Sequence, residues 1–470
     1  MPTLAIKSGT TAIAGSTVKG SFSYFSASTI DLGPTSSTGF YSGVDAPSGG
    51  YTVYQIGGSG GWTARVATDD ASLNSILISA GGTGSTVDQN ITWATNTNSV
   101  YINSGTTSAA TSTYFYYGGS NFVTKINSDY TTVNSSFSTG TGFDALVNKV
   151  TTDSSSKLLV GGQFTTFNSS SQNRLVRLNT DGSKDTSLNI GTGFNNTVIS
   201  IVTDTNSKIM VGGSYTQFSG ASQGSLIRLN SDGSKDSSFV IGVGFAGSPA
   251  INDMKVNSDG KIYCTGNWGA YSGSTNFRRI IRINTNGSAD STFNVGTGGT
   301  SGFNALGTRL VIDSNGKLLV GGNFTTYNTQ TAIRLVRLNT DGTVDSTFSV
   351  GTGFDAVVNA LAIDSNGKIL VGGGFTTFTG SSQVGLIRLN SDGSKDTSFN
   401  VGTGISSASQ ILSITVDTNG KIICVGSFYT YNGTSTPYNQ VILNSDGSFY
   451  SAGNSSAALS TIYSSISSTS

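Results

Sequence analysis

Short apolar runs separated by turn-forming residues recur along most of the chain. In "ALAIDSNGKILVGG" (360–373), two such runs flank the pair Asn366-Gly367. Runs this short, rich in β-branched residues and bounded by Gly, Asn and Asp, predict β-strands. An Asn-Gly pair between two strands predicts a tight hairpin in which both turn residues take positive φ. The same turn is expected at Asn315-Gly316, Asn419-Gly420 and Asp259-Gly260.

The next stretch, "GLIRLNSDGSKDTSF" (385–399), supplies a further strand and a second turn at Asp392-Gly393. A weaker fourth run ends near Phe399. Successive strands joined by short turns pair as antiparallel neighbours. The pattern therefore predicts a meander of four antiparallel strands.

This four-stranded unit repeats with a period of about 51 residues. Aligned on the "VGG" segment, the seven units hold Tyr117, Val160, Val211, Cys264, Val320, Val371 and Cys424 at one position. Such a period predicts an all-β, seven-bladed β-propeller over residues 95–455, because closing the ring leaves only short strand edges. A linear β-solenoid is the structural alternative, and it would favour shorter repeats. Since Cys264 and Cys424 replace Val in separate repeats, we expect small buried residues and no disulfide.

The two ends of the chain do not repeat. Residues 1–94 predict a small α+β module that precedes the propeller, with a strand at 51–58. A helix is expected over 68–82, capped by Asp69 or Thr68. Its apolar face would hold Leu73, Ile76, Leu77 and Ala80. We expect residues 1–94 to be an attachment domain, and residues 456–470 to add a closing strand or to dock on a neighbour.

Six of the units share the pattern "GKILVGG-F…RLNSDGS-D-SF…GTGF". The pattern resembles the delta-60 repeat, a β-propeller family of bacterial and bacteriophage proteins. The resemblance covers the second to seventh units, whereas the first, "YFYYGGSNFVTKINSDY" (114–130), has lost the "FTTF" segment. It implies a propeller fold and leaves the activity open.

The amino-acid composition argues against several classes of function. Lys plus Arg and Asp plus Glu number 25 each, and charged residues make up only 11% of the chain. No excess of positive charge therefore favours nucleic acid or an anionic membrane. The chain has no His, and every acidic residue is Asp, so the commonest general base and metal ligand is missing. No apolar stretch is long enough for a membrane span, and the first residues lack the pattern of a secretory signal.

The run "N-x-D-G-x-x-D" presents regularly spaced oxygen ligands. It occurs at Asn179, Asp181 and Asp185, at Asn230, Asp232 and Asp236, and at Asn390, Asp392 and Asp396. Alternating carboxylates around a Gly resemble a calcium loop, but such a loop ends in a bidentate Glu. Asp and Asn also bond their own backbone in turns. Turn formation is the main interpretation and a weak cation site the alternative; no metal or cofactor is predicted.

Arg and aromatic residues also recur at fixed places in the repeat. Each Arg is expected to pair with the Asp of a nearby "GSKD"-type segment, and ligand recognition is the alternative. The Arg series is Arg177, Arg228, Arg282, Arg337 and Arg388. The aromatic pairs are Phe164/Phe167, Tyr215/Phe218, Trp268/Tyr271, Phe324/Tyr327, Phe375/Phe378 and Phe428/Tyr431. Recurrence at every repeat predicts packing between blades; stacking on sugars is the alternative.

A catalytic site is a unique arrangement of residues, whereas the carboxylates of this chain recur with the repeat. No catalytic residue is therefore predicted, and a glycan hydrolase built on an Asp pair is the least favoured reading. The "GTGF" segments lack the helix and Lys of a phosphate loop. The loops after the aromatic pairs do vary, and variable loops on a fixed scaffold are where binding specificity resides. These loops are residues 168–174, 219–225, 328–334 and 432–440.

Residues 33–58 and the predicted propeller are rich in Ser, Thr, Asn and Gly, and this composition is similar to that of bacteriophage virion appendage proteins. We therefore expect a non-enzymatic, multi-copy structural protein of a tailed-phage virion, such as a fibre, tail or capsid-decorating component. Residues 1–94 would contact other virion proteins, and the propeller would face outward toward a host glycan or receptor. A bacterial surface or secreted adhesin with a carbohydrate-binding propeller is the alternative.

Overall fold

The computed structural model describes residues 134–450 except 205, 248, 297–300, 407–408 and 437–439, together with seven strands before residue 134. The chain divides into two compact units. One comprises residues 98–454, and the other comprises residues 1–97 together with 455–470. The predicted tail at 456–470 lies outside the described residues, and the predicted boundaries at 94 and 455 remain predictions.

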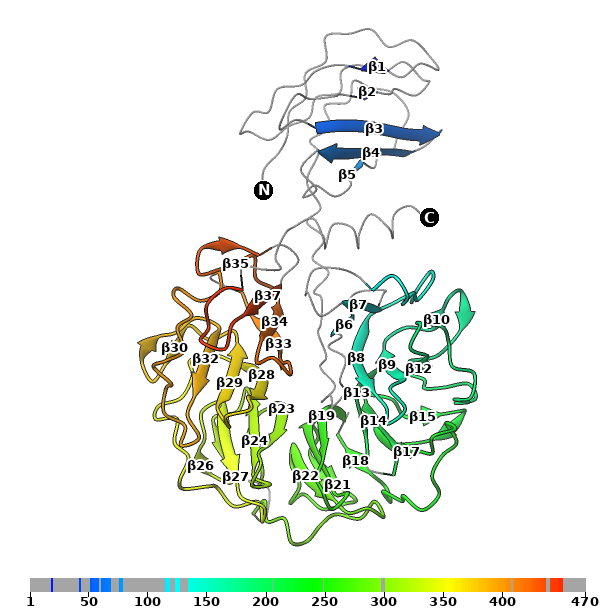
Figure 1. Ribbon diagram of the computed structural model, residues 1–470. Helices are drawn as coiled ribbons and strands as arrows, with labels where there is room; N and C mark the ends of the chain where they lie inside the picture. The colour runs from blue at the N-terminus through cyan, green and yellow to red at the C-terminus, as the bar shows by residue number, and fades with distance from the viewer. Residues whose placement is uncertain are drawn as a thin grey trace. The chain divides into compact units, whose positions relative to one another are not determined.

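Six three-stranded antiparallel sheets follow one another through residues 98–454 (Figure 1). We call them blades two to seven and the two-stranded sheet before them, β6 (Phe115–Gly118) and β7 (Val123–Ile126), blade one. Blades two to four are β8 (Val147–Thr152), β9 (Leu158–Gly162) and β12 (Leu175–Leu178); β13 (Val198–Thr203), β14 (Ile209–Gly213) and β17 (Leu226–Leu229); and β19 (Ala250–Val256), β20 (Ile262–Asn267) and β22 (Ile280–Ile283). Blades five to seven are β23 (Gly307–Ile312), β24 (Leu318–Gly322) and β27 (Leu335–Leu338); β28 (Val358–Ile363), β29 (Ile369–Gly373) and β32 (Leu386–Leu389); and β33 (Ile411–Val416), β34 (Ile422–Gly426) and β37 (Gln440–Leu443).

The predicted fourth strand is reduced to one bridge in each of these blades. In blade six, Leu389 bridges to Lys395, and the chain then turns away. The turn forms because the Asp396 carboxylate accepts a hydrogen bond from Ser398 N at 3.1 Å, which competes with strand pairing. Two-residue hairpins lie between the second and third strands, such as β30 (Thr377–Phe378) with β31 (Ser381–Ser382). The others are β10 (Thr166–Phe167) with β11 (Ser170–Ser171), β15 (Gln217–Phe218) with β16 (Ala221–Ser222), β25 (Thr326–Tyr327) with β26 (Gln330–Thr331), and β35 (Thr430–Tyr431) with β36 (Thr434–Ser435). In blade four, β21 (Ala270–Tyr271) pairs with β18 (Phe245–Ala246) instead.

The N-terminal unit is also built from strands where it is described. β3 (Tyr51–Gly58), β4 (Gly61–Thr68) and β5 (Ile76–Ile78) form an antiparallel sheet, and β1 (Val18–Lys19) pairs in parallel with β2 (Ser42–Gly43). The strand predicted at 51–58 is confirmed. The helix predicted over 68–82 is wrong, because residues 76–78 pair with β4. The run Ile-Leu-Ile is rich in β-branched residues, and a neighbouring strand edge satisfies its backbone groups.

The hairpin turns differ in type from the prediction. In blade six, Gly367 has φ 74°, but Asn366 does not have a positive φ. Gly367 N donates to Asp364 O at 3.0 Å, and the Asp364 carboxylate accepts from Asn366 N and Lys368 N at 2.9 Å. The loop is therefore a type I turn followed by one left-handed Gly, and the Asp side chain replaces the second positive-φ residue.

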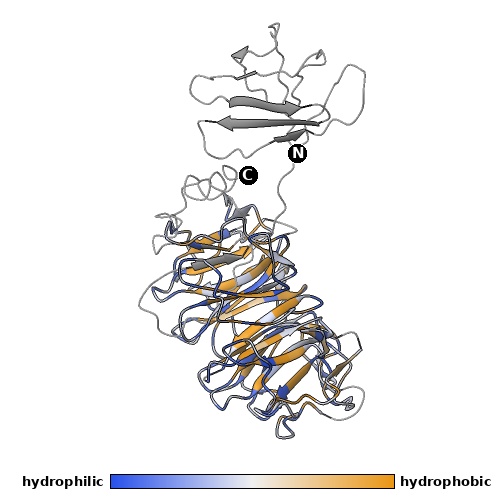
Figure 2. Ribbon diagram, turned by 90° about the vertical axis from the view of Figure 1, so that its right-hand side faces the viewer, coloured by the Kyte–Doolittle hydropathy of each residue, from blue (hydrophilic) through white to orange (hydrophobic). Residues whose placement is uncertain are grey.

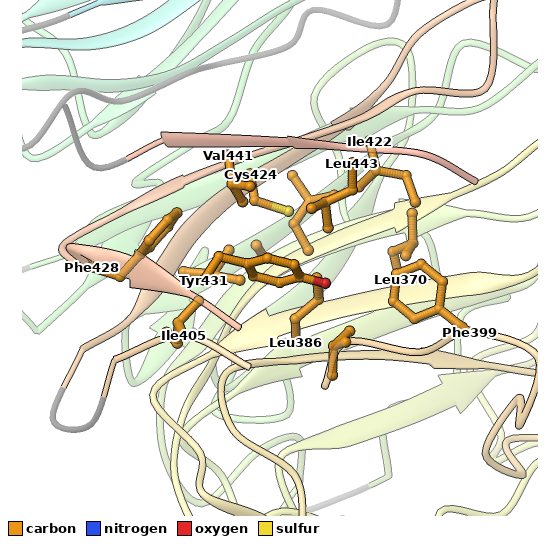
Figure 3. Packing of buried hydrophobic residues seen from close by; sticks show 14 residues of the cluster. Leu370, Leu386, Phe399, Ile405, Ile422, Cys424, Phe428, Tyr431, Val441 and Leu443 are labelled. Carbon is orange, nitrogen blue, oxygen red and sulfur yellow. The ribbon is translucent and has the colours of Figure 1, made fainter. Parts of the chain in front are cut away.

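Hydrophobic residues are concentrated in the strands of the blades (Figure 2). The buried clusters combine side chains from neighbouring blades. Figure 3 shows Leu370 and Leu386 of blade six against Cys424 and Tyr431 of blade seven. The repeat position predicted to be buried is fully buried in blades two to seven, so that prediction is confirmed. Its residues are Val160, Val211, Cys264, Val320, Val371 and Cys424. Both cysteines are free thiols, and burial raises their pKa values well above the usual range.

These blades follow one another face to face, with the first strand of each contacting the first strand of the next. The order of contact runs from β6 through β8, β13, β19, β23 and β28 to β33. Sheets arranged in this way form the body of a β-propeller. Closure of seven blades into a ring remains a prediction, because most of blade one lies outside the described residues.

Two blades carry Ser where the hairpin Gly is expected, which offers a test of the turn. Ser156 is exposed and has φ 60°, a conformation that costs an L-residue roughly 1–2 kcal/mol. Ser156→Gly would remove this conformational cost, but Gly makes the unfolded chain more flexible and so offsets part of the gain. We therefore expect Ser156→Gly to raise the free energy of unfolding by about 0.5–1 kcal/mol. Urea unfolding with an unchanged m-value would measure the gain.

The reverse change at the equivalent place serves as the control. Gly367 has φ 74°, and a Cβ built there would have no atom within 4 Å. Gly367→Ser should therefore lower the unfolding free energy by about 1 kcal/mol through backbone conformation alone. Opposite signs for the two variants support the left-handed turn position, and equal signs would contradict it.

Candidate functional site

Every complete blade except the last contains a buried ion pair between its third strand and the segment that follows. Arg337 Nε donates to Asp345 Oδ2 at 2.6 Å, and Lys317 Nζ reaches the same oxygen at 2.9 Å. The Arg337 and Asp345 side chains are only 9% and 3% exposed. The same pair recurs as Arg177–Asp185, Arg228–Asp236, Arg282–Asp290 and Arg388–Asp396. The prediction that each Arg pairs with a nearby Asp is therefore confirmed.

The two Asp residues of each "D-G-x-x-D" run have different partners. Asp341 is exposed, and its Oδ1 accepts from Thr343 N at 2.9 Å and from Thr343 Oγ1 at 2.7 Å. Asp345 instead faces Arg337 and Lys317. Within residues 134–450, apart from the gaps, no group of three or more His, Cys, Asp or Glu side chains could hold a metal ion. The carboxylates thus form a turn and an ion pair.

The Arg residue also joins its blade to the next one. Arg337 Nη1 donates to Ser391 O at 2.5 Å, in the turn of blade six, and the guanidinium lies 4.8 Å from the Phe348 ring centroid. The same turn receives a backbone bond from Ser349 N to Asp392 O at 2.9 Å. Gly393 closes it with φ 91°. A Cβ there would lie 2.5 Å from Ser349 O, so only Gly fits.

The recurring aromatic pairs are buried. In blade six, Phe375 and Phe378 lie 4.6 and 4.9 Å from Phe354, which comes from the preceding "GTGF" segment. Both members of all six pairs are at most 7% exposed. They are therefore packing residues, as predicted, and the surfaces of these rings are not available to stack on a sugar. The sequence prediction missed the third aromatic ring, which explains the position of "GTGF" in the repeat.

The variable loops form one side of a shallow groove. In blade six, a groove of about 330 Å³ is lined by Gly351, Thr379, Ser381, Ser382, Gln383 and Lys395. Blade three has its counterpart, about 380 Å³, lined by Gly191, Ser219, Ser222, Gln223 and Lys235 among others. Both volumes lie within the range of small-molecule sites. We call these sites the blade grooves.

A Gln and a Lys give the blade grooves their polar character. In blade six, Gln383 Nε2 donates to Leu386 O at 2.6 Å, and its Oε1 accepts from Lys395 Nζ at 2.7 Å. Blade two has the same pair, Gln172 and Lys184, whereas blade five has Ala332 and Val344. The two positions therefore change together within this chain, a signal that the sequence prediction did not use.

The buried Asp residues predict a specific sensitivity to acid. Burial acts to raise the pKa of Asp345, but Lys317, Thr347 and Arg337 outweigh it and hold this pKa well below its usual range. The corresponding interactions lower the pKa of Asp396 to about 2. The series is Asp185, Asp236, Asp290, Asp345 and Asp396.

A carboxyl whose pKa is lower in the folded state stabilises the fold above its unfolded pKa of about 3.9. We therefore expect the free energy of unfolding to fall steeply between about pH 4 and pH 2, as urea titrations at each pH would show. Asp345→Asn should flatten this dependence while lowering stability at pH 7, because Arg337 loses its charge partner. A free energy that stays constant down to pH 2 would contradict the ion-pair assignment.

Five segments of the chain match a protein-family model described as "Domain of unknown function (DUF5122) beta-propeller". They are residues 154–188, 206–239, 257–293, 314–348 and 365–399. Each contains a hairpin, a third strand and the Arg–Asp pair of one of blades two to six. No curated protein matches the sequence. No helix among the described residues has the length and apolar character needed to cross a membrane.

Several solved structures are similar in backbone, at low identity. One is the extracellular domain of the putative one component system BT4673 from B. thetaiotaomicron, at 15% identity and TM-score 0.45, covering 70% of this chain and 39% of that one. Another is the WD40 beta propeller domain of Doa1, at 17% identity and TM-score 0.41, covering 70% and 93%. A third is virginiamycin B lyase from Staphylococcus aureus, at 12% identity and TM-score 0.42, covering 71% and 93%.

This chain thus spans well under half the length of the first of these proteins. Likeness at this level does not transfer an activity. The fold assignment instead rests on the family match and on the sheets themselves. The repeated body of this chain is a β-propeller, and five of its repeats match the DUF5122 β-propeller model.

Proposed function

We propose that this chain is a non-enzymatic binding and structural protein of a particle surface, with a tailed-phage virion as the first candidate. The propeller would be a rigid platform that presents the blade grooves to a host glycan, and residues 1–94 would attach the chain to other virion proteins. The observation that carries this proposal is the recurrence of one groove, with a Gln and a Lys in its wall, in blades three and six. Repeated weak sites favour binding through avidity.

The chemistry of the acidic residues supports a non-enzymatic role. The chain has no His and no Glu, and five buried Asp residues are occupied by Arg and Lys. A general acid or base needs a pKa near the working pH. The pKa values of these carboxyls are shifted away from that range, so the repeated Asp residues are poor candidates for acid–base catalysis.

The blade grooves support binding of a polar, hydroxyl-rich ligand. Their walls offer Ser hydroxyls, a Gln amide and a Lys ammonium beside apolar side chains, Phe378 and Val350 in blade six and Phe218 and Ile190 in blade three. The polar groups donate and accept hydrogen bonds, and the apolar side chains, at most 9% exposed, add only a small apolar surface beside them. A bacterial surface or secreted adhesin would use the same grooves, and it is the second candidate because the groove chemistry does not depend on the carrier.

Removing the lysines of the two blade grooves, Lys235 and Lys395, together with Lys184 at the equivalent place in blade two, tests the binding proposal. Lys184, Lys235 and Lys395 are exposed, so the triple change to Ala should leave the fold intact. We expect the full chain to bind at least one polysaccharide of a glycan panel, and the triple Ala variant to bind it at least about tenfold more weakly, since each site loses a charged hydrogen bond. The triple change to Arg keeps the charge and is the control.

Each result has a clear meaning. Equal binding by the Ala and Arg variants would remove the blade grooves from the proposal. Binding to no glycan at all would contradict the binding role. Release of reducing sugar from a bound polysaccharide would contradict the non-enzymatic role.

Deleting residues 1–94 tests the proposed attachment. A stable protein–protein contact buries at least about 1,000 Å², so losing its attachment domain should abolish incorporation into purified particles. The β-rich far-ultraviolet spectrum and cooperative melting of the remaining chain would show that the propeller is still folded. Incorporation of the truncated chain at the normal copy number would show that residues 1–94 are not the attachment site.

A further inference from the structure

The first strand of every complete blade contains an irregularity at the same place. The pairing with the second strand shifts just before one residue, as between Val147 and Lys149 in blade two. These bulge residues are Lys149, Ser200, Asp253, Arg309, Ala360 and Ser413. A bulge re-aims side chains and often adjoins a functional site. Unlike the Arg–Asp pairs, this position changes its chemistry from blade to blade.

Interactions between non-adjacent blades place Lys149, Asp253 and Arg309 on the side where the first strands of the blades converge, which we call the axis. Arg309 of blade five donates from Nη2 to Leu412 O of blade seven at 3.3 Å, past blade six. Lys149 of blade two is electrostatically coupled to Asp253 of blade four and to Arg309. The first strands of neighbouring blades contact each other. Side chains from blades that are not neighbours can therefore meet only where all the first strands come together.

Positive charge exceeds negative charge in this axial cluster. Among the residues that the structure describes, Lys149, Lys255 and Arg309 interact with one carboxylate, that of Asp253. Lys149 is 9% exposed and Asp253 is 3% exposed, so water compensates these charges poorly. Both Asp253 oxygens already accept backbone bonds, from Met254 N at 3.0 Å and from Leu310 N at 2.9 Å.

Ser200 holds the same register position on β13, which contacts the strands of Lys149 and Asp253, β8 and β19. Ser200 is 1% exposed, and its Oγ has no hydrogen-bond partner among the described residues. Leaving a buried hydroxyl without a partner costs free energy. Burial, together with Lys255 and Arg309, lowers the pKa of Lys149 to about 7, against the opposing effect of Asp253. Among the described residues, three positive charges thus face one carboxylate beside a buried hydroxyl that has no partner.

We propose that the axial cluster of Lys149, Ser200, Lys255 and Arg309 binds a small oxyanion, such as phosphate, sulfate or a carboxylate. The anion would balance the excess charge, accept a hydrogen bond from Ser200 and hold Lys149 in its protonated form. The site uses non-repeating residues and is separate from the blade grooves. It does not depend on the proposed function.

Binding of inorganic phosphate and sulfate to the full chain tests this proposal. Calorimetry and thermal melting would compare each anion with chloride at matched ionic strength. We expect phosphate or sulfate to raise the melting temperature where chloride does not, and Lys149→Met to weaken binding at least about tenfold because a charged partner is lost.

Ser200→Ala should weaken anion binding by a smaller factor. Lys395→Met, in a blade groove, should bind as the unmodified chain does. Acetate in place of phosphate distinguishes a carboxylate from a tetrahedral ligand.

The pH dependence provides a readout that loss of structure would not reproduce. The charged groups facing Lys149 are Asp253 and Lys255 on β19 and Arg309 on β23, while Ser200, Ala360 and Ser413 do not titrate in this range. Sulfate keeps its charge between pH 6 and 8.5, so its affinity should fall across this range as Lys149 loses its proton. In Lys149→Met this dependence should disappear.

Two results would overturn the proposal. One is a thermal shift that chloride reproduces at matched ionic strength, which would indicate general screening. The other is an unchanged anion affinity in both Lys149→Met and Ser200→Ala. Lys149→Met removes a buried charge, so we expect this variant to fold. If it does not fold, the anion affinity of Ser200→Ala decides between the two outcomes.

Discussion

In blades two to six, the arginine on the third strand joins three parts of the propeller at once. Its Nε binds the buried Asp of its own blade, and its Nη1 binds a carbonyl in the turn of the next blade, as Arg337 does with Asp345 and Ser391. Its planar face lies over a Phe ring. Guanidinium suits this role because it offers five donors in a fixed plane and keeps its charge when buried. Removing the Arg would leave Asp345 with the partly exposed Lys317, and removing the Asp would leave the buried guanidinium of Arg337 without its closest carboxylate. Breaking a buried ion pair typically costs about 3–5 kcal/mol.

The other repeated features follow from this junction. The turn that receives the Arg needs Gly, because the backbone of the preceding segment lies where a Cβ would be, as at Gly393 against Ser349. The same segment continues into "GTGF", whose Phe completes the aromatic cluster of the next blade. Polar junction, tight turn and apolar core are thus consecutive parts of one repeat. A substitution in any of them affects two neighbouring blades.

A body in which the repeated residues serve stability leaves few places for recognition. The blade grooves lie beside the loops that vary, and Gln383 and Lys395 are exchanged for apolar residues in blade five. The axial cluster lies around a register position of the first strands whose charge differs from blade to blade. In both places the backbone is fixed by the repeat while the side chain is free to change, which is the usual arrangement of binding sites on a rigid scaffold.

The sequence by itself determined the features that repeat. The strands, the period, the buried Val and Cys position and the Arg–Asp pairs could all be predicted, because a residue with the same environment in every blade produces a periodic signal. The predicted fourth strand is longer than the observed one, because hydrogen bonds between Asp and the following Ser end the strand after one bridge. The turn at Asn366-Gly367 was assigned the wrong type, because the Asp364 side chain takes part in it. The helix expected over 68–82 failed where residues 76–78 pair with a neighbouring strand.

Only the tertiary structure decided which non-repeating residues meet. Lys149, Asp253 and Arg309 are more than 50 residues apart in sequence, and each resembles an ordinary strand residue in its own repeat. They come together because every first strand converges on the same axis and every bulge falls at the same register. The pairing of Gln383 with Lys395 likewise depends on the hairpin between them. Local sequence sets each strand, but the juxtaposition of side chains from separate blades is a property of how the blades pack.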